Sequence, residues 1–454
     1  MTQREYDAIV IGAGPAGEVA AGRLADGGLS VAICEQELIG GECSFYACMP
    51  SKALLRPGEL IGEVQRVPGL HLQSTHVDAA AALARRDEVI HDGDDSSMLP
   101  WLEERGIELF RDPARLDGER QVVAGDDRLS ARKAVVVATG SAASLPPIDG
   151  LAGAEPWTNR EGTTAGEVPS SLLVIGGGPV GCELAQAWRS LGSDVALLEV
   201  ADRLLAGEEA FASEQVTAAL REAGIDVRTG VEIASVVRDE DRFHVVLDGE
   251  ETLEAAELMV AAGRDPRTTD LGLDTVGLEP GGFLPVDERM LVEGRDWLYA
   301  VGDVNGRSLL THSGKYQARV AADVILGRDA RATTDAEGPP RVTFTDPQVS
   351  AVGLPLDAAA EAGIRARAVD VTTSANAGAS FRGRNTEGTS RLVVDEDRRV
   401  VVGATFVGYE TAELLHAATI SVAAELTVDQ LWDAIAVFPT RTEVWLRLLE
   451  EYGL

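Results

Sequence analysis

The chain has 454 residues, 45% of them hydrophobic, which is enough for about two to four ordinary domains with large apolar cores. Forty Lys and Arg against 74 Asp and Glu give a formal net charge of −34, which disfavours binding to nucleic acid or to an anionic membrane surface. Four cysteines are too few for a disulfide-stapled secreted domain, and the N-terminus resembles no signal peptide. We therefore expect a cytoplasmic protein with no nucleic-acid partner and no membrane association.

The first predicted element is a strand–helix–strand unit at the N-terminus. In DAIVIGAGPAGEVAAGRLADGGLSVAICEQE, an apolar strand runs into Gly12-x-Gly14-x-x-Gly17, and a second strand ends at Glu35. The first glycine permits a tight turn, the second lets the backbone approach a pyrophosphate, and the third lets the helix pack on the strand. The helix N-terminus then faces phosphates, and the carboxylate accepts hydrogen bonds from ribose hydroxyls. The pattern predicts a dinucleotide site.

The next segment, GGECSFYACMPSK, holds Cys43 and Cys48. On a regular helix, Cα atoms five positions apart lie roughly 8 to 9 Å apart, beyond the roughly 4.4 to 6.8 Å that a disulfide spans. We therefore expect an irregular backbone, caused by the glycine pair and the proline of this segment. Because no histidine stands at ligand spacing and structural disulfides are rare in a reducing compartment, a redox-active pair is favoured and no metal is predicted. Cys34 and Cys182 lack a redox context and are expected to be small buried fillers.

A second strand–helix–strand unit follows a predicted strand and a proline-marked exit at residues 133–150. In SLLVIGGGPVGCELAQAWRSLGSDVALLEVADR, the three glycines recur and the second strand ends at Glu199. One glycine motif alone is weak evidence, but the same order of strand, glycines, helix, strand and acid found twice predicts two dinucleotides. Glu199 favours NADH, since a carboxylate repels a 2′-phosphate, whereas Arg203 could weaken this preference and admit NADPH.

The C-terminal part of the chain is not repeated. ELMVAAGRDPRT (257–268) and WLYAVGDVNG (297–306) each predict a strand that runs into a glycine turn. A polar, proline-marked linker begins near residue 331. The last hundred or so residues alternate strands with amphipathic helices, which predicts a separate α+β domain.

Together these pieces resemble the pyridine nucleotide-disulfide oxidoreductase family over essentially the whole chain, closest in style to dihydrolipoamide dehydrogenase, with glutathione reductase and mercuric reductase as cousins. The matching pieces are both dinucleotide units, Gly-Gly-x-Cys-x4-Cys-x-Pro-Ser-Lys, Ala138-Thr139-Gly140, Gly263-Arg264-x-Pro266, Gly302-Asp303 and Thr345-Asp346-Pro347. The resemblance implies an α/β fold with two Rossmann-like domains for FAD and NAD(P) and a C-terminal α+β dimerisation domain that forms a homodimer. The implied segments are the FAD domain (1–150), the NAD(P) domain (151–267), a central part returning to the FAD domain (268–338) and the dimerisation domain (339–454).

The resemblance also implies roles for single residues. Cys48 would face the flavin as a charge-transfer thiolate, and Cys43 would be the interchange thiol that attacks the substrate. Lys52, one of only three lysines, would lie near the flavin N5 and pair with Glu183, although Glu183 could equally be a first-turn helix acid. The predicted catalytic residues are Cys43, Cys48, Lys52, Glu183 and Glu443. The predicted cofactor-binding residues are Gly12, Gly14, Pro15, Gly17, Glu35, Gly41, Glu42, Lys52, Thr139, Gly140, Gly176, Gly178, Pro179, Val180, Gly181, Glu199, Gly263, Arg264, Gly302, Asp303 and Thr311.

The chain departs from the family at its C-terminal motif, His-Pro-Thr-x-x-Glu. Phe438 replaces the histidine, which in the family acts as acid and base for the partner subunit's thiols, while Pro439, Thr440 and Glu443 remain. A phenyl ring cannot move a proton, and general acid–base catalysis is typically worth about 10²- to 10⁴-fold.

Three functions stay open. The first is an NADH-dependent flavin disulfide reductase, with Tyr46, Tyr316 or His312 in place of the missing base. The second passes electrons to a quinone, dye, metal ion or oxygen, and the third is a redox sensor or complex subunit with little turnover. The intact set of two cysteines and the following lysine favours the first, so the predicted partner is a small-molecule disulfide or another electron acceptor.

Overall fold

The computed structural model describes residues 3–70, 76–239, 241–249 and 251–454, which pack as two compact units. Each unit combines segments that are far apart in the sequence. The first unit consists of Met1–Pro50, Asp87–Ser144 and Gly263–Ala336, and the second of Ser51–Arg86, Leu145–Ala262 and Glu337–Leu454. None of the helices in these described ranges is both long enough and apolar enough to cross a membrane.

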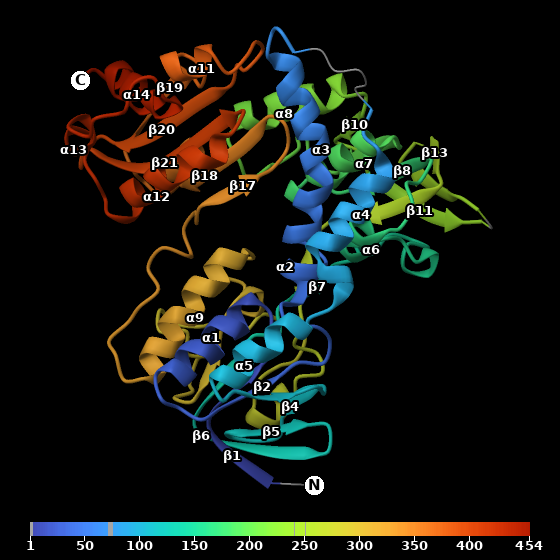
Figure 1. Ribbon diagram of the computed structural model, residues 1–454, viewed down its shortest axis with the longest axis vertical. Helices are drawn as coiled ribbons and strands as arrows, with labels where there is room; N and C mark the ends of the chain where they lie inside the picture. The colour runs from blue at the N-terminus through green and yellow to red at the C-terminus, as the bar shows by residue number, and fades with distance from the viewer. Residues whose placement is uncertain (1–2, 71–75, 240, 250) are drawn as a thin grey trace. The chain divides into compact units, whose positions relative to one another are not determined.

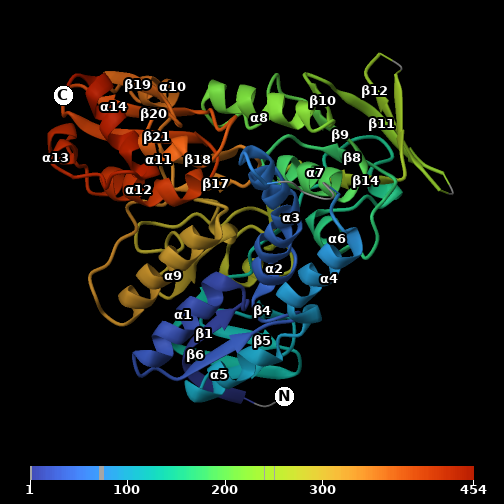
Figure 2. The ribbon, with the colours of Figure 1, turned by 45° about the horizontal axis from the view of Figure 1, so that its top comes forward.

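The first unit is built on a mainly parallel sheet in the order β3-β2-β1-β6-β5-β4, with β16 also paired to β6. Its strands are β1 (Gln3–Ile11), β2 (Val31–Cys34), β3 (Glu108–Phe110), β4 (Ala114–Leu116), β5 (Gln121–Ala124), β6 (Asp127–Val137) and β16 (Leu298–Ala300). Side chains alternate between the two faces of a strand. Ala8 and Val10 therefore join the core beneath α1 (Pro15–Asp26) and α9 (Thr311–Ile325), while Ile9 and Ile11 join the core on the opposite face. Figures 1 and 2 show α1 and α9 side by side.

A short antiparallel pair, β7 (Ser141–Ala143) with β15 (Arg264–Pro266), also belongs to the first unit. It joins the residues that follow β6 to those at Gly263. This pairing brings two glycine turns together that are more than a hundred positions apart in the chain.

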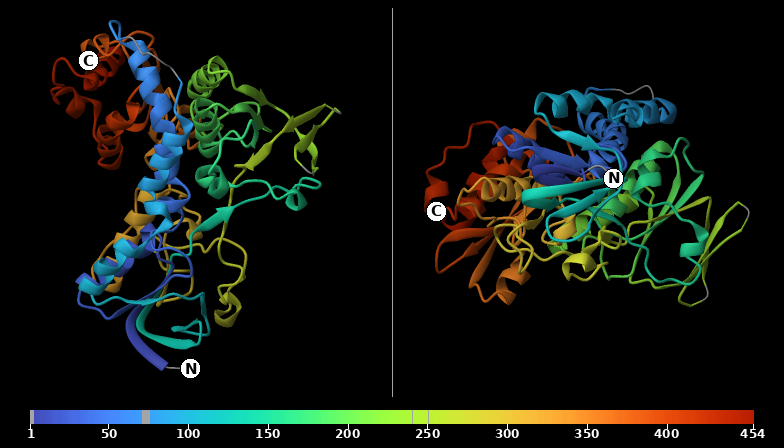
Figure 3. Two further views of the ribbon diagram at one scale, coloured as in Figure 1. Left: turned by 45° about the vertical axis from the view of Figure 1, so that its right-hand side comes forward. Right: turned by 90° about the horizontal axis from the view of Figure 1, so that it is seen from below.

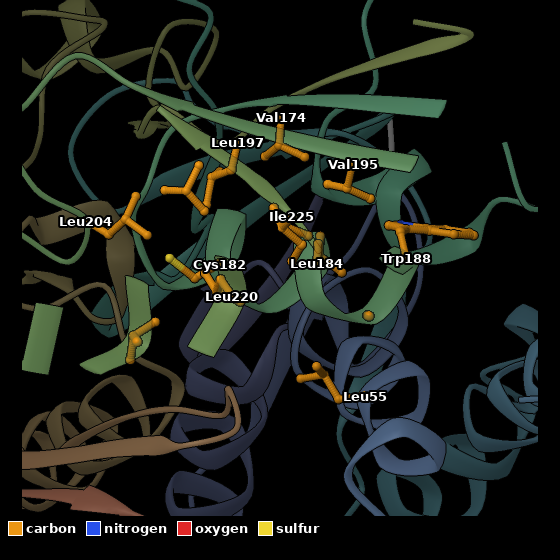
Figure 4. Packing of buried hydrophobic residues seen from close by; sticks show 14 of the residues in the cluster. Leu55, Val174, Cys182, Leu184, Trp188, Val195, Leu197, Leu204, Leu220 and Ile225 are labelled. Carbon is orange, nitrogen blue, oxygen red and sulfur yellow. The ribbon is translucent and has the colours of Figure 1, made fainter. Parts of the chain in front are cut away.

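The second unit contains a second parallel sheet, in the order β10-β9-β8-β14. Its elements are β8 (Ser171–Ile175), α7 (Pro179–Leu191), β9 (Asp194–Glu199), α8 (Ala210–Glu222), β10 (Asp226–Thr229) and β14 (Glu257–Val260). An antiparallel sheet of β11 (Ile233–Arg238), β12 (Phe243–Leu247) and β13 (Thr252–Ala255) extends outward from it, drawn yellow-green in Figure 3. Figure 4 shows Cys182 surrounded by apolar side chains, among them Leu204 and Leu220, as expected for a buried filler.

The C-terminal part of the second unit is an antiparallel sheet with helices packed against it (Figure 2). The strand order is β17-β18-β21-β20-β19, from β17 (Arg341–Thr343), β18 (Gln348–Gly353), β19 (Ala366–Thr372), β20 (Thr389–Asp395) and β21 (Val400–Gly408). Its core includes residues of α12 (Leu415–Ala423) and α14 (Val444–Tyr452). Two Rossmann-like sheets followed by an α+β domain confirm the predicted fold class, while the predicted domain boundaries stay predictions.

Helices α2 (Gly41–Phe45) and α3 (Cys48–Arg66) carry the cysteine segment. Further helices are α4 (Ala79–Val89), α5 (Leu99–Glu104), α6 (Asn159–Thr164), α10 (Leu356–Glu361), α11 (Ala377–Ser380) and α13 (Val428–Trp432).

Candidate functional site

The first glycine loop has the shape that a pyrophosphate requires. Gly12 has a φ of +100°, and a Cβ there would lie 2.4 Å from the Ala138 carbonyl oxygen. A Cβ on Gly17 would lie 1.9 Å from the Gly12 oxygen, so helix and strand approach too closely for a side chain. Over Gly14, in contrast, no atom of the described chain beyond its immediate neighbours lies within 4 Å of a Cβ position. The second glycine thus leaves open the approach to the N-terminus of α1, where backbone N–H groups attract phosphate.

The second loop repeats this geometry. A Cβ on Gly176 would lie 2.4 Å from the Ala261 oxygen, and one on Gly181 would lie 1.8 Å from the Gly176 oxygen. The position over Gly178 is again open within the described residues. Each helix begins at a proline directly after its open glycine, Pro15 and Pro179.

A carboxylate braces each loop. Glu35 accepts hydrogen bonds from the backbone N–H groups of Ala13 and Glu37, both at 2.8 Å. Glu199 likewise accepts hydrogen bonds from the backbone N–H groups of Gly177 and Ala201. Each acid is therefore fixed at the end of its strand, beside an open glycine cradle, where a ribose binds in this type of fold. Both sites fit a dinucleotide.

Arg203 lies close to the second of these sites but is already engaged. Its guanidinium donates hydrogen bonds to the backbone oxygens of Glu208 at 2.9 Å and Ala206 at 2.7 Å. A guanidinium held in this way is turned to the loop carbonyls, which weakens the case for a 2′-phosphate site.

Asp303, three residues after the end of β16, is part of a hydrogen-bonded chain in the first unit. Ser141 donates to Asp303 Oδ2 at 2.6 Å and accepts from Arg264 Nε at 2.6 Å. Burial raises the pKa of Asp303, and the hydrogen bond from Ser141 opposes this shift. The sequence did not point to Ser141, because nothing in its local pattern shows that β7 and β15 pair.

The predicted residues Thr139, Gly140 and Glu42 meet around Arg267. Thr139 Oγ1 donates to the Arg267 oxygen at 2.9 Å, and the Arg267 N–H donates to the Gly140 oxygen at 3.0 Å. Arg267 Nη2 also lies 3.1 Å from Glu42 Oε1. The Ser144 N–H donates to the Gly263 oxygen at 3.0 Å.

A buried network that sequence reasoning missed holds the turn before Asp303. Gln317 Oε1, on α9, accepts from the Gly302 N–H at 2.8 Å, and Gln317 Nε2 donates to Asp335 at 2.8 Å. Arg307 donates twice to the same carboxylate, both at 2.9 Å. Asp335 is 1% exposed, so the network acts in a region of low dielectric. It fixes the backbone that carries Asp303.

The cysteine segment is irregular, as expected, but not at the proline. Helix α2 ends before Tyr46, which has a φ of −133°, and α3 begins at Cys48. Pro50 lies within the first turn of α3 and does not form the break. Gly41 has a φ of +56°, and a Cβ there would lie 2.9 Å from the Gly14 Cα, so the glycine pair lets this segment pack on the first loop.

Cys43 and Cys48 are reduced thiols in hydrogen-bond contact, each half-buried. The hydrogen bond with Cys48, and then burial, raise the pKa of Cys43, while Thr311 and the charge of Lys315 lower it. Thr311 Oγ1, at the start of α9, lies 3.4 Å from Cys48 Sγ. Cys48 opens α3, and a helix N-terminus stabilises a thiolate. No three His, Cys, Asp or Glu side chains of the described chain form a metal cluster.

Lys52 follows Cys48 by four residues on α3 and pairs with Glu183. Lys52 Nζ lies 2.6 Å from Glu183 Oε2, and the Phe344 N–H donates to Glu183 Oε1 at 2.8 Å. The ammonium lies 4.8 Å from the centroid of the Phe344 ring. Glu183 is thus more than a first-turn helix acid, because both of its oxygens are engaged.

The C-terminal motif offers a carboxylate without an imidazole. Phe438 is 73% exposed, whereas Glu443 is 6% exposed. Glu443 Oε2 has no hydrogen-bond partner among the residues that the structure describes. Of the three suggested substitutes for the missing base, Tyr316 is committed elsewhere, since its hydroxyl accepts from the Thr333 N–H at 3.1 Å. His312 is exposed on α9, and Tyr46 packs against Phe45.

The structure gathers the predicted site residues into two sets. The first unit contains Gly12, Gly14, Pro15, Gly17, Glu35, Gly41, Glu42, Cys43, Cys48, Thr139, Gly140, Gly263, Arg264, Gly302, Asp303 and Thr311. The second contains Lys52, Gly176, Gly178, Pro179, Val180, Gly181, Glu183, Glu199 and Glu443.

Comparison with known proteins gives two family matches. Residues 6–322 match the family model described as pyridine nucleotide-disulphide oxidoreductase, and residues 339–448 match its dimerisation domain. The chain belongs to this family. It is therefore an FAD-dependent NAD(P)H oxidoreductase that passes electrons to a disulfide, and its dimerisation domain indicates a homodimer.

Individual relatives cover nearly all of the chain. It is 31% identical to a mercuric reductase of Bacillus cereus over 97% of its length and 70% of that protein. It is 32% identical to a dihydrolipoyl dehydrogenase of Thermus scotoductus over 97% of its length and 96% of that protein. A copper(II) complex of the HOCl-induced flavoprotein disulfide reductase RclA from Escherichia coli matches with a TM-score of 0.87 and 25% identity, covering 98% of this chain and 99% of that one.

Proposed function

We propose that the chain takes two electrons from NADH and delivers them through Cys43 and Cys48 to a small disulfide. The observation that carries this proposal is the thiol pair itself, in hydrogen-bond contact at the N-terminus of α3 beside Thr311. FAD, when bound, accepts the hydride of NADH and supplies two electrons to the Cys43–Cys48 disulfide. Lys52, paired with the buried Glu183, supplies a positive charge one helical turn after Cys48.

The thiol steps balance without a metal. The Cys43 thiolate attacks one sulfur of the substrate disulfide, and the other half leaves as a thiolate that takes up a proton. Cys48 then attacks the mixed disulfide, which releases the second half of the substrate and restores the Cys43–Cys48 disulfide. NADH is oxidised and the substrate disulfide is reduced to two thiols.

The nicotinamide donor is assigned to NADH on the geometry of the second loop. Glu199 stands braced at the strand end, and Arg203 is held by backbone oxygens. A fixed carboxylate accepts hydrogen bonds from a 2′-hydroxyl and repels a 2′-phosphate. The ratio of kcat/KM for NADH to that for NADPH tests this assignment, and a ratio below one contradicts it.

A second acceptor, a thiophilic metal ion, is favoured by Phe438. A disulfide acceptor gains from a partner-subunit base, whereas a thiophilic ion displaces the thiol protons itself and needs no base. The relatives include mercuric reductases, and RclA forms a copper(II) complex. In this scheme the two thiolates bind the ion, which is a substrate and receives the electrons of NADH.

The deciding experiment measures NADH oxidation with lipoamide, glutathione disulfide, a quinone, Hg²⁺ and Cu²⁺. Cys43→Ser and Cys48→Ser are compared with Cys34→Ala, a control at a buried cysteine of β2 that packs in an apolar core and has no predicted redox role. Disulfide turnover that disappears in both serine variants and persists in the control supports the proposal. Turnover with the metal ions or the quinone but with neither disulfide overturns the disulfide assignment. A flavin that NADH does not bleach rapidly would leave only the role of a redox sensor or complex subunit.

A further inference from the structure

The loop between β9 and α8, residues 200–209, packs against the second glycine loop. The Leu205 N–H donates to the Gly177 oxygen at 2.9 Å. Leu204 is fully buried, and a Cβ on Gly177 would lie 2.4 Å from its Cδ2 atom. Leu205 has a φ of +48°, which is costly for a leucine, so contacts around the loop must hold this conformation.

Two arginines from the C-terminal part of the second unit hold the end of this loop. Arg341, on β17, donates to both carboxylate oxygens of Glu208, at 2.6 Å and 2.9 Å. Arg391, on β20, donates to Glu209 at 2.8 Å, and the other oxygen of Glu209 accepts from the Leu356 N–H at 2.9 Å. The side chains of both ion pairs are at most 22% exposed, so salt screens them less than it screens pairs on the surface.

The same end of the loop captures Arg203. The guanidinium of Arg203 donates to the backbone oxygens of Glu208 at 2.9 Å and Ala206 at 2.7 Å. Glu208 therefore binds Arg203 through its backbone and Arg341 through its side chain. Arg203 follows Glu199, the acid of the predicted ribose site, by only four residues. The position of the Glu208 backbone thus decides whether a cation near that site is occupied or free.

We propose that Arg341 and Arg391 are positioning residues that determine the preference for NADH. Their ion pairs hold the loop in the form whose backbone oxygens bind Arg203, which leaves Glu199 to repel a 2′-phosphate. When the pairs are broken, the loop releases the guanidinium, which then binds the 2′-phosphate of NADPH through charge-assisted hydrogen bonds. The inference rests on the proposed function only in the assignment of NADH as the electron donor.

The test measures how NADH and NADPH bleach the bound flavin of the full-length holoenzyme in rapid mixing, with no acceptor present. The concentration dependence gives an apparent Kd and a limiting rate for each nucleotide. Arg341→Met, Arg391→Met and their combination are compared with Arg365→Met, which removes the same charge from an exposed pair with Asp397. We expect the ratio of the NADPH Kd to the NADH Kd to fall about tenfold in the double variant, as for one added charge-assisted hydrogen bond, and to stay at the parent value in the control.

Further variants separate release of the loop from a simple change of charge. Glu208→Gln removes a negative charge and Arg341→Met removes a positive one, yet release of the loop predicts that both shift the Kd ratio toward NADPH. Each single variant should show part of the shift, so the test holds even if the double variant loses its FAD. Adding Arg203→Ala to Arg341→Met should cancel the gain, because it removes the group that binds the 2′-phosphate.

Three results would overturn the proposal. They are Kd ratios that match that of Arg365→Met, opposite shifts in Glu208→Gln and Arg341→Met, and a shift toward NADPH that persists when Arg203 is also replaced. A parent that already binds NADPH more tightly than NADH would contradict the NADH assignment, and the proposal with it. Since the flavin is reduced without an acceptor, none of these results depends on whether the protein reduces a disulfide.

Discussion

Replacing Phe438 by histidine tests whether the missing base limits disulfide turnover. Phe438 is exposed, so the substitution removes little buried apolar contact and should leave stability almost unchanged. Glu443 lies five residues on, and its buried Oε2 has no hydrogen-bond partner within the described part of the chain, so it is available to accept a hydrogen bond from an imidazole. A well-placed acid–base group is worth about 10²- to 10⁴-fold, or roughly 3 to 5 kcal/mol of transition-state stabilisation. Because few neighbours hold a side chain at this exposed position, we expect a gain of about tenfold in kcat/KM for lipoamide or glutathione disulfide.

Two controls make this test decisive. Phe438→Ala opens the same space without supplying a base and should gain nothing. The double variant Phe438→His, Glu443→Gln should lose most of the gain, because the imidazole no longer has a carboxylate to orient it. Equal disulfide activity of the histidine and alanine variants would refute the argument. If turnover of Hg²⁺ or a quinone were also unchanged in both variants, the acceptors that need no proton relay would be favoured.

Three further predictions concern stability and cofactor binding. Burial raises the pKa of Glu18 from 4.5 to about 7, so the free energy of unfolding is highest below pH 4.5 and falls by roughly 3 kcal/mol as the pH rises through 7. In urea unfolding, the stability of Glu18→Gln relative to the parent should therefore increase by about this much between pH 4.5 and 8. Asp335→Ala leaves the Arg307 and Gln317 donors buried without their acceptor, at a cost of about 3 to 5 kcal/mol of folding stability, and should speed FAD release measured by flavin fluorescence. Unchanged FAD retention would show that the turn at Gly302 does not need this network. Arg203→Ala should leave the NADH to NADPH ratio of kcat/KM within about twofold, and a larger change would mean that Arg203 does reach the nucleotide.

The parts of the fold that the sequence predicted are those governed by local chemistry. Both glycine loops, their helices and their terminal acids were predictable because turn, close approach and carboxylate are all encoded within about 30 residues. The structure shows the steric reason: at Gly12 and Gly17 a Cβ would collide with backbone, and at Gly14 it would fill the cradle.

The contacts that the sequence could not predict join distant segments. The bond from Ser141 to Asp303 exists because β7 pairs with β15, and the cover of Lys52 by Phe344 requires a loop that is almost 300 residues away. No period or motif in either segment specifies its partner. The pairing of Lys52 with Glu183 was accessible only through the family resemblance, since a first-turn helix acid explains the same residue locally.

The absence of an imidazole at position 438 changes where proton control can come from. In a dimer with a partner-subunit histidine, the base titrates near pH 6.5 and the thiol can stay protonated until it reacts. Here the hydrogen bond with Cys48 and burial raise the pKa of Cys43, and the Thr311 hydroxyl and the Lys315 ammonium, both on α9 of the same chain, oppose this shift. An ammonium stabilises a thiolate but cannot accept its proton at neutral pH. The rate of disulfide attack must then follow the fraction of Cys43 that is ionised, so activity with disulfides should climb with pH well beyond 7, where a histidine-based enzyme has already levelled off.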